Sequence, residues 1–298
     1  MSYFPEGVDI NSLIDDLRLY SWSASDILLK YGQYLKNPKY RNDFIKNKAN
    51  NEPVTSADLD VNNLIIKNLQ DKYGNVSWDI LSEESINNLS KLKINSDWLW
   101  ILDPLDGTKD FIQGTGDFAM HLALNYRNKP IIGIVLIPQR NELWIANGNK
   151  VWCENKNGIK KNHNLSHCKS IGDMTVVTSK NHRNKELQTL ISNIGFKNSI
   201  SMGSIGCKIA AILRGEADIY ISLSLPGKSA PKDWDFAAPD AILNQAGGYI
   251  STLNNKELIY GQDGYMQKGL IIASNDKKNH ETICLEIKDI LKRNNFYL

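Results

Sequence analysis

Residues 98–102 form an unbroken apolar run that ends at Asp103-Pro104-Leu105-Asp106-Gly107. Such a run is typical of a short strand that is buried on both faces. Proline cannot donate a hydrogen bond to a neighbouring strand, and glycine permits a tight turn. We therefore expect the strand to stop at Asp103 and the chain to bend where two carboxylates appear.

Asp103 and Asp106 lie three positions apart on this bend, so both side chains can point into one small volume. Two close carboxylates repel, and one of them must bind a proton unless a cation lies between them. Hard divalent cations such as Mg2+ favour carboxylates together with phosphate oxygens and water. The Thr108 hydroxyl and the amides of Gly107 and Thr108, at the start of a helical turn, would then offer a place for phosphate.

Two other interpretations of this stretch are open from the residues alone. An Asp-Gly pair is a common turn between a strand and a helix, and it needs no ligand. The aspartyl-phosphate phosphatases also place a nucleophilic aspartate after a hydrophobic strand, but a single residue separates their two aspartates. Here two residues separate Asp103 from Asp106, which favours metal ligands over a covalent nucleophile.

The composition is that of a globular protein without an extreme charge. Of the 298 residues, 42% are hydrophobic and 23% are charged, and the net charge is +2. With its lysines dispersed, such a chain indicates neither a nucleic-acid polymer nor a membrane surface as partner. The four cysteines show no Cys-x-x-Cys pairing, the N-terminus lacks the features of a secretory signal, and no apolar run approaches the length of a membrane span. We therefore expect a reduced, cytoplasmic protein.

The hydrophobic pattern changes near residue 165, so we expect two halves, residues 1–165 and residues 166–298. The first half is predicted to contain helices, two strands and an antiparallel meander. In the second half, strands alternate with helices. The expected helices cover residues 10–31, 58–73, 187–194, 204–214 and 232–245, and a last helix begins at about residue 279. The expected strands cover residues 78–81, 98–102, 175–179, 217–223 and 269–273, together with the strands of the meander at 118–153. Residues 37–51 are expected to form a hairpin or loop.

Acidic residues recur at the ends of expected strands and the starts of expected helices. Together with their neighbours they resemble motifs of the Mg2+-dependent, lithium-sensitive phosphatases of the inositol monophosphatase superfamily. The Asp-Pro-Leu-Asp-Gly-Thr and Trp-Asp-x-Ala-Ala motifs are highly specific in combination, and the matching segments span most of the chain. These segments are Pro53-Val54-Thr55-Ser56-Ala57-Asp58, Ser82-Glu83-Glu84-Ser85, Trp100-Ile101-Leu102-Asp103-Pro104-Leu105-Asp106-Gly107-Thr108 and Trp234-Asp235-Phe236-Ala237-Ala238.

The resemblance implies a layered α/β/α/β/α sandwich with two or three Mg2+ ions bound between its two halves. Glu83, Asp103 and the backbone carbonyl of Leu105 would hold the first ion. Asp103, Asp106 and Asp235 would hold the second ion.

The same resemblance assigns the catalytic roles. Asp58, with Glu83, would serve a weaker third metal site and accept a hydrogen bond from Thr108. Asp58, Thr108 and Glu83 would together activate a water molecule, so that no side chain becomes phosphorylated.

The residues that follow the threonine indicate the substrate class. Lys109-Asp110-Phe111 is similar to the corresponding segment of the CysQ-type 3'(2'),5'-bisphosphate nucleotidases, which remove the 3'-phosphate of adenosine 3',5'-bisphosphate. Gly203-Ser204-Ile205-Gly206-Cys207-Lys208 is similar to their nucleotide-binding segment, with one extra residue before the lysine. The arginine that these enzymes often carry after Ile219-Tyr220 is absent, and Lys228 or Lys232 would supply its charge. The resemblance thus implies substrate contacts from Gly107, Thr108, Lys109, Ser204, Lys208 and Lys228.

Two classes of function follow from this reading. The first is an active phosphatase, whose expected substrates are bisphosphate nucleotides in the first place and inositol phosphates or sugar bisphosphates in the second. The second is a non-catalytic Mg2+-binding relative that acts as a regulator or scaffold, and the presence of every expected ligand argues against it. The expected partner is a small phosphomonoester substrate, and a homodimer is common in the family.

Overall fold

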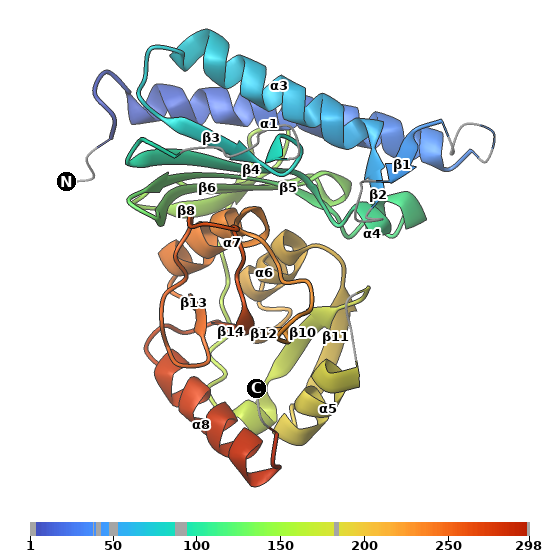
Figure 1. The fold of residues 1–298 in the computed structure, drawn as a ribbon, viewed down its shortest axis with the longest axis vertical. Coiled ribbons are helices and arrows are strands. Elements are labelled where there is room, and N and C mark those ends of the chain that lie inside the picture. Colours follow the sequence, from blue (N-terminus) through green and yellow to red (C-terminus); the bar gives the residue numbers. More distant parts are fainter. Residues whose placement is uncertain are drawn as a thin grey trace.

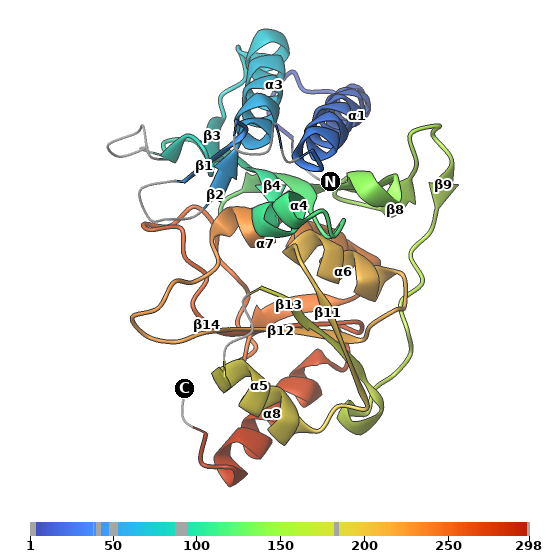
Figure 2. The ribbon, with the colours of Figure 1, turned by 90° about the vertical axis from the view of Figure 1, so that its right-hand side faces the viewer.

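A computed structural model describes residues 4–37, 39, 43–47, 53–86, 94–181 and 185–296. Helices and sheets alternate in five layers from the top to the bottom of Figure 1, and the side view in Figure 2 shows the same order. The expected α/β/α/β/α sandwich is therefore confirmed. The layers are α1 (Ile10–Leu35) with α3 (Ser56–Tyr73), a seven-stranded sheet, α6 (Ile205–Leu213) with α7 (Asp233–Ala246), a five-stranded sheet, and α5 (Lys185–Ile194) with α8 (His280–Arg293).

The seven-stranded sheet contains the predicted meander. Its strands lie in chain order, β3 pairs parallel with β4, and every other neighbouring pair is antiparallel. A short helix, α4 (Thr108–Gln113), follows β4. The strands are β3 (Asp79–Ser82), β4 (Trp98–Asp106), β5 (Ala119–Tyr126), β6 (Lys129–Ile137), β7 (Glu142–Ala146), β8 (Val151–Glu154) and β9 (Lys160–Lys161).

The predicted end of β4 at Asp103 is wrong, because the strand continues to Asp106. Asp103 pairs with His121 and Asp106 pairs with Ala119, and the register shifts between them. Pro104, which has no N–H to donate, falls within this irregularity, where a missing hydrogen bond is tolerated. The turn that we expected at Asp103 thus comes at Gly107, whose φ of 88° is left-handed.

The five-stranded sheet mixes parallel and antiparallel pairs in the order β11-β10-β12-β14-β13. Two of its strands, β11 and β13, were not expected from the sequence. β11 lies at an edge and is rich in polar residues, so it carries little hydrophobic signal. The strands are β10 (Thr175–Ser179), β11 (Asn198–Met202), β12 (Ile219–Ser224), β13 (Tyr249–Thr252) and β14 (Gly269–Ser274). The predicted boundary at residue 165 falls between β9 and β10, and the division into two domains stays a prediction.

The layers are held together by apolar clusters on both faces of each sheet. Trp100 of β4 belongs to the cluster under α1 and α3, whereas its neighbour Ile101 faces α6 and α7. Phe236 of α7 joins Ile101 in the central cluster, and Ile287 of α8 belongs to the lowest one. β4, the strand whose last residues include Asp103 and Asp106, is therefore buried on both faces, as expected. Every residue of α6 is buried, because this helix is sandwiched between two sheets.

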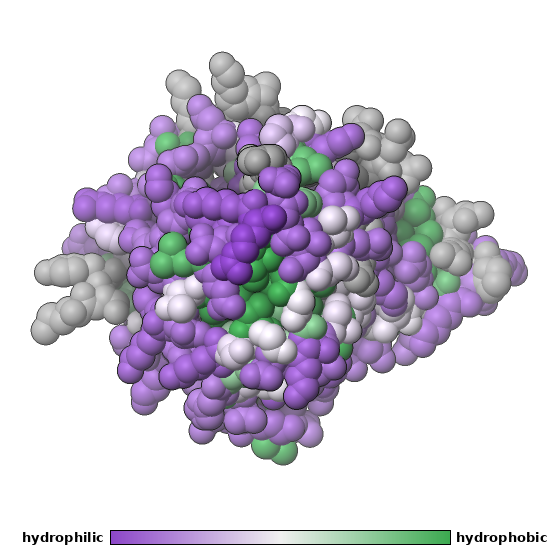
Figure 3. Space-filling view, turned by 90° about the horizontal axis from the view of Figure 1, so that it is seen from below, coloured by the Kyte–Doolittle hydropathy of each residue, from purple (hydrophilic) through white to green (hydrophobic). Residues whose placement is uncertain are grey.

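The remaining described elements lie at the periphery. β1 (Ile45–Asn47) and β2 (Pro53–Thr55) form a small antiparallel pair, which confirms the hairpin in part, and residues 38, 40–42 and 48–52 of that region lie outside the described residues. Seen from below, the molecule is mostly hydrophilic, with an apolar area near the centre of the view and smaller ones scattered toward its edges (Figure 3). Among the described helices, none is both long and apolar enough to cross a bilayer.

Candidate active site

The predicted acidic residues converge where two parallel strands end and two helices begin. Asp103 and Asp106 lie on the last part of β4, and Glu83 directly follows β3. Because β3 and β4 are parallel and Ser82 is level with Leu102, Glu83 comes beside Asp103. The Glu83 amide continues this pairing with a hydrogen bond of 3.1 Å to the Leu102 carbonyl. Asp235 lies in the first turn of α7, which packs on the face of the seven-stranded sheet that carries Ile101.

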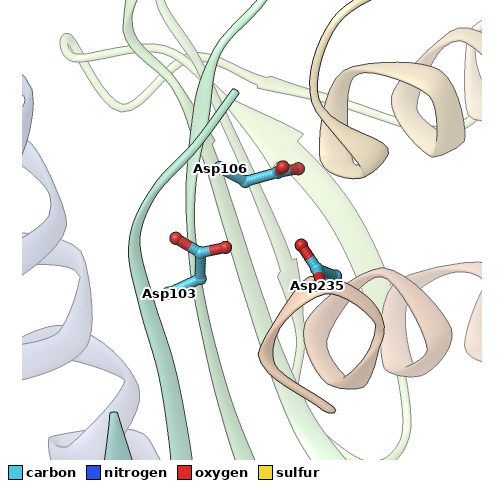
Figure 4. A group of neighbouring side chains, drawn as sticks. All are labelled: Asp103, Asp106 and Asp235. Carbon is cyan, nitrogen blue, oxygen red and sulfur yellow. The ribbon is translucent and has the colours of Figure 1, made fainter. Parts of the chain in front are cut away.

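Three of these carboxylates form a compact cluster. Oxygen atoms of Asp103, Asp106 and Asp235 all lie within 4.8 Å of one another, and the side chains point into a common space (Figure 4). Burial raises the pKa of Asp103 well above its ordinary value, and the charges of Glu83, Asp106 and Asp235 raise it further. The pKa of Asp235 is raised by burial and by Asp106. One buried and two half-buried carboxylates, whose mutual repulsion needs a cation, fit a hard divalent ion such as Mg2+.

Asp106 of β4 also forms hydrogen bonds to the start of α6, in the second half of the chain. Its Oδ2 accepts a hydrogen bond of 2.7 Å from the Ser204 hydroxyl and one of 2.5 Å from the Ile205 amide, at the start of α6. These donors occupy one carboxylate oxygen and leave Oδ1 for a metal ion. Ser204, which was expected to contact substrate, has a left-handed φ of 37° and directs its hydroxyl to Asp106, so a substrate contact there stays a prediction.

Asp58 has both a structural contact and a contact toward the site. Its Oδ2 accepts hydrogen bonds from the Thr55 amide at 2.8 Å and from the Thr55 hydroxyl at 2.6 Å, which caps α3. Its Oδ1 lies 3.4 Å from the Thr108 hydroxyl, so the expected contact between Asp58 and Thr108 is present. The same hydroxyl donates at 3.1 Å to the Leu105 carbonyl. Burial raises the pKa of Asp58 to about 7.

The lysines expected to bind substrate lie in different surroundings. Lys208 is only 3% exposed, donates at 3.1 Å to the Ser204 carbonyl, and lies 5.3 Å from the centre of the Tyr220 ring. Burial lowers the pKa of Lys208, although nearby Asp106 opposes this effect. Lys109 and Lys228 are exposed. No observation tests the substrate contacts of these three lysines, which stay predictions.

Two other buried polar residues, His121 and Asp110, lie near the site, and the sequence alone assigned neither of them an individual role. His121 of β5 is fully buried, and its Nε2 lies 3.4 Å from Oδ2 of Asp106. A histidine within a mostly apolar strand was the available signal. Asp110 of α4 is also buried, and it accepts hydrogen bonds of 2.5 Å from Asn181 and 2.8 Å from Thr115. Asp110 thus links α4 to the segment that follows β10.

The layered fold and this carboxylate cluster are typical of metal-dependent phosphatases, and comparison with known proteins identifies the class. The model of the inositol monophosphatase family matches residues 20–292, so the chain belongs to this family, as expected from its motifs. Among curated relatives, the 3'(2'),5'-bisphosphate nucleotidase CysQ of Escherichia coli K12 is 31% identical over 232 residues, which cover 77% of this chain and 88% of that protein.

Solved structures agree with this assignment. The Thermotoga maritima IMPase superposes with a TM-score of 0.72 at 18% identity, covering 95% of this chain and 99% of that one, which supports the fold. CysQ from Bacteroides thetaiotaomicron, described as a bacterial member of the inositol monophosphatase family, superposes with a TM-score of 0.67 at 26% identity. That match covers 85% of this chain and 94% of the CysQ chain.

Proposed function

We propose that this protein is a Mg2+-dependent phosphomonoesterase that converts adenosine 3',5'-bisphosphate to AMP and phosphate. The observation that carries the proposal is the carboxylate cluster of Asp103, Asp106 and Asp235 beside the contact between Asp58 and Thr108. The choice of substrate is supported by the CysQ nucleotidases among its relatives.

The donor set suits the metal that the family requires. In this proposal Glu83, Asp103 and the Leu105 carbonyl hold one ion, and Asp103, Asp106 and Asp235 hold another. When bound, Mg2+ supplies positive charge that offsets the charge of the phosphate and acidifies water. The raised pKa values of Asp103 and Asp235 indicate how strongly this pocket favours added positive charge, either as protons or as a metal ion.

Thr108 and Asp58 are the residues proposed to orient and deprotonate the attacking water. A general base works best when its pKa lies near the operating pH, and that of Asp58 lies at about 7. Its Oδ2 is held by Thr55, which fixes the carboxylate, while Oδ1 faces the Thr108 hydroxyl. The hydroxyl can therefore pass a proton toward Asp58 while it directs the oxygen of water at phosphorus. Glu83, beside Asp103, would assist as a neighbouring anion.

The phosphate is proposed to lie over the start of α4, against the amides of Gly107 and Thr108. The helices α3, α6 and α7 also begin at the site, since Asp58, Ser204 and Asp235 lie in or just before their first turns. The positive ends of these helix dipoles favour a bound anion.

The alternative within this family is an inositol monophosphatase or a sugar bisphosphatase, and one observation favours it. Lys208, assigned to the second phosphate of the nucleotide, is buried and bonded to the Ser204 carbonyl. Lys109 and Lys228 are the exposed cations that would hold the 5'-phosphate instead. We further propose a cytoplasmic location, because the four cysteines are free, and a homodimer, which is common in the family.

The test is phosphate release from adenosine 3',5'-bisphosphate, inositol 1-phosphate and fructose 1,6-bisphosphate at equal concentration with Mg2+. We expect the highest kcat/KM for the nucleotide, and no turnover of any substrate in a chelator. A higher kcat/KM for inositol 1-phosphate would replace the nucleotidase assignment by the inositol phosphatase one. Absence of turnover on the whole panel, with Mg2+ bound, would favour the non-catalytic relative.

A further inference from the structure

His121 connects the two elements that supply the second metal site. It lies on β5 with no exposed surface, and its Nδ1 lies 3.3 Å from the carbonyl oxygen of Trp234 at the start of α7. Its Nε2 lies 3.4 Å from Oδ2 of Asp106 on β4, in a close packing contact that is not a hydrogen bond. Trp234 directly precedes Asp235, so a single imidazole touches one carboxylate of the cluster and the backbone next to another.

The first turn of α6 closes against this imidazole. A Cβ atom placed on Gly206 would lie 2.2 Å from Nε2 of His121 and 2.8 Å from Cγ1 of Val135. Only glycine lets α6 approach so closely, and this approach brings the Ile205 amide to Asp106. His121 is therefore in contact with β4, α6 and α7, which all meet at the carboxylate cluster.

Asp106 and Asp235 need such a support because they come from different halves of the molecule and repel each other. The charge of Asp106 is the largest electrostatic cause of the raised pKa of Asp235. Asp103 and Asp106, by contrast, are held by the same strand. Mg2+ requires oxygen ligands at about 2.1 Å in near-octahedral geometry, so its affinity depends steeply on how these two carboxylates are spaced.

We propose that His121 is a positioning residue that sets the spacing of Asp106 and Asp235, and thereby the affinity of the metal site that they share. The inference rests on the proposed Mg2+ site and on no particular substrate. Groups that orient metal ligands from behind typically contribute 10- to 100-fold to metal affinity, so a loss of about this size is expected when His121 is removed.

The first experiment measures Mg2+ binding to the full chain by calorimetry, without substrate. His121→Leu keeps a similar volume but removes the polar contact with the Trp234 carbonyl and the planar ring packed beside Asp106. We expect its Kd for Mg2+ to rise about 10- to 100-fold. The matched control is His280→Leu, because His280 is also buried and contacts the hydroxyls of Ser251 and Ser274 at 2.7 Å each. The control should lower the unfolding temperature and leave the Kd for Mg2+ unchanged. An equal rise in both variants, or no rise in His121→Leu, would overturn the proposal.

The second experiment is a double-mutant cycle with Gly206, which tests the same contact if His121→Leu folds poorly. Gly206→Ala should weaken Mg2+ binding in the wild-type background, because its methyl group displaces the imidazole. In a His121→Ala background the same change should weaken binding much less, since the closest clash, with the imidazole, is then gone and only the contact with Cγ1 of Val135 remains. Equal effects in both backgrounds would show that the imidazole does not set the spacing. Because Mg2+ binding is measured alone, a failure of the nucleotidase assignment would leave this result intact.

Discussion

Replacing Asp58 by asparagine should stabilise the metal-free protein and inactivate the enzyme. Burial raises the pKa of Asp58 from its ordinary 3.8 to about 7. A carboxyl group whose pKa is raised by folding costs no stability below pH 3.8, and the cost grows as the pH rises and is complete above pH 7. At about 1.4 kcal/mol per pKa unit, the full cost is about 4 kcal/mol.

Asparagine removes this cost but keeps the helix cap. Its carbonyl oxygen can accept the hydrogen bonds that the Thr55 amide and hydroxyl now donate at 2.8 and 2.6 Å. In a chelator, urea unfolding from about pH 3 to pH 8 should show Asp58→Asn equal to the wild type at the acid end of this range. At pH 8 the variant should be more stable by about 4 kcal/mol. With Mg2+, phosphate release by the variant should fall by about 100-fold or more, as expected for loss of a general base.

The matched control is Asp240→Asn. Burial also raises the pKa of Asp240 to about 7, and this residue of α7 accepts a hydrogen bond of 2.7 Å from Tyr260, outside the carboxylate cluster. Asp240→Asn should gain stability with pH in the same way and retain its activity. The reasoning would be refuted if Asp58→Asn were less stable than the wild type by the same amount at every pH. In that case Asp58 ionises normally in the folded protein and acts only as a cap.

Four further predictions concern the metals, the water, the second phosphate and lithium. Asp103→Asn and Asp235→Asn should each lower kcat by more than about 100-fold and weaken Mg2+ binding, because each removes a negatively charged metal ligand. Near-normal rates in both variants would contradict the metal assignment. Thr108→Ala should lower kcat and leave KM within a few-fold, whereas a large rise in KM alone would make Thr108 a phosphate anchor. Lys228→Ala should lower kcat/KM for adenosine 3',5'-bisphosphate by about 10-fold or more and leave kcat/KM for adenosine 3'-monophosphate unchanged, because only the bisphosphate carries a 5'-phosphate. Equal losses of kcat/KM on both substrates would place the 5'-phosphate elsewhere. Lithium should inhibit the wild type in the same assay, as the family resemblance implies.

Much of the acidic cluster could be predicted from short segments of the sequence. Asp103 and Asp106 are three positions apart on one irregular strand end, so their proximity depends only on local geometry. The capping of α3 by Thr55 is equally local, because the hydrogen bonds join residues three positions apart. The buried strands and the meander could be predicted because burial leaves a periodic hydrophobic pattern in neighbouring residues. The strands β11 and β13 were missed because both lie at the edges of their sheet and contain few apolar residues.

The tertiary structure decided which polar groups of the second half reach the site, and how. Ser204 and Asp106 are 98 positions apart, and their hydrogen bond exists only because α6 packs against the end of β4. Lys208, whose substrate contact stays a prediction, is only 3% exposed because α6 is sandwiched between two sheets. His121 becomes a link between Asp106 and α7 only when three distant segments meet around it. Hydrophobic periodicity and local spacing therefore determine the elements and the motif, whereas the burial and partners of polar side chains depend on long-range packing that no local pattern records.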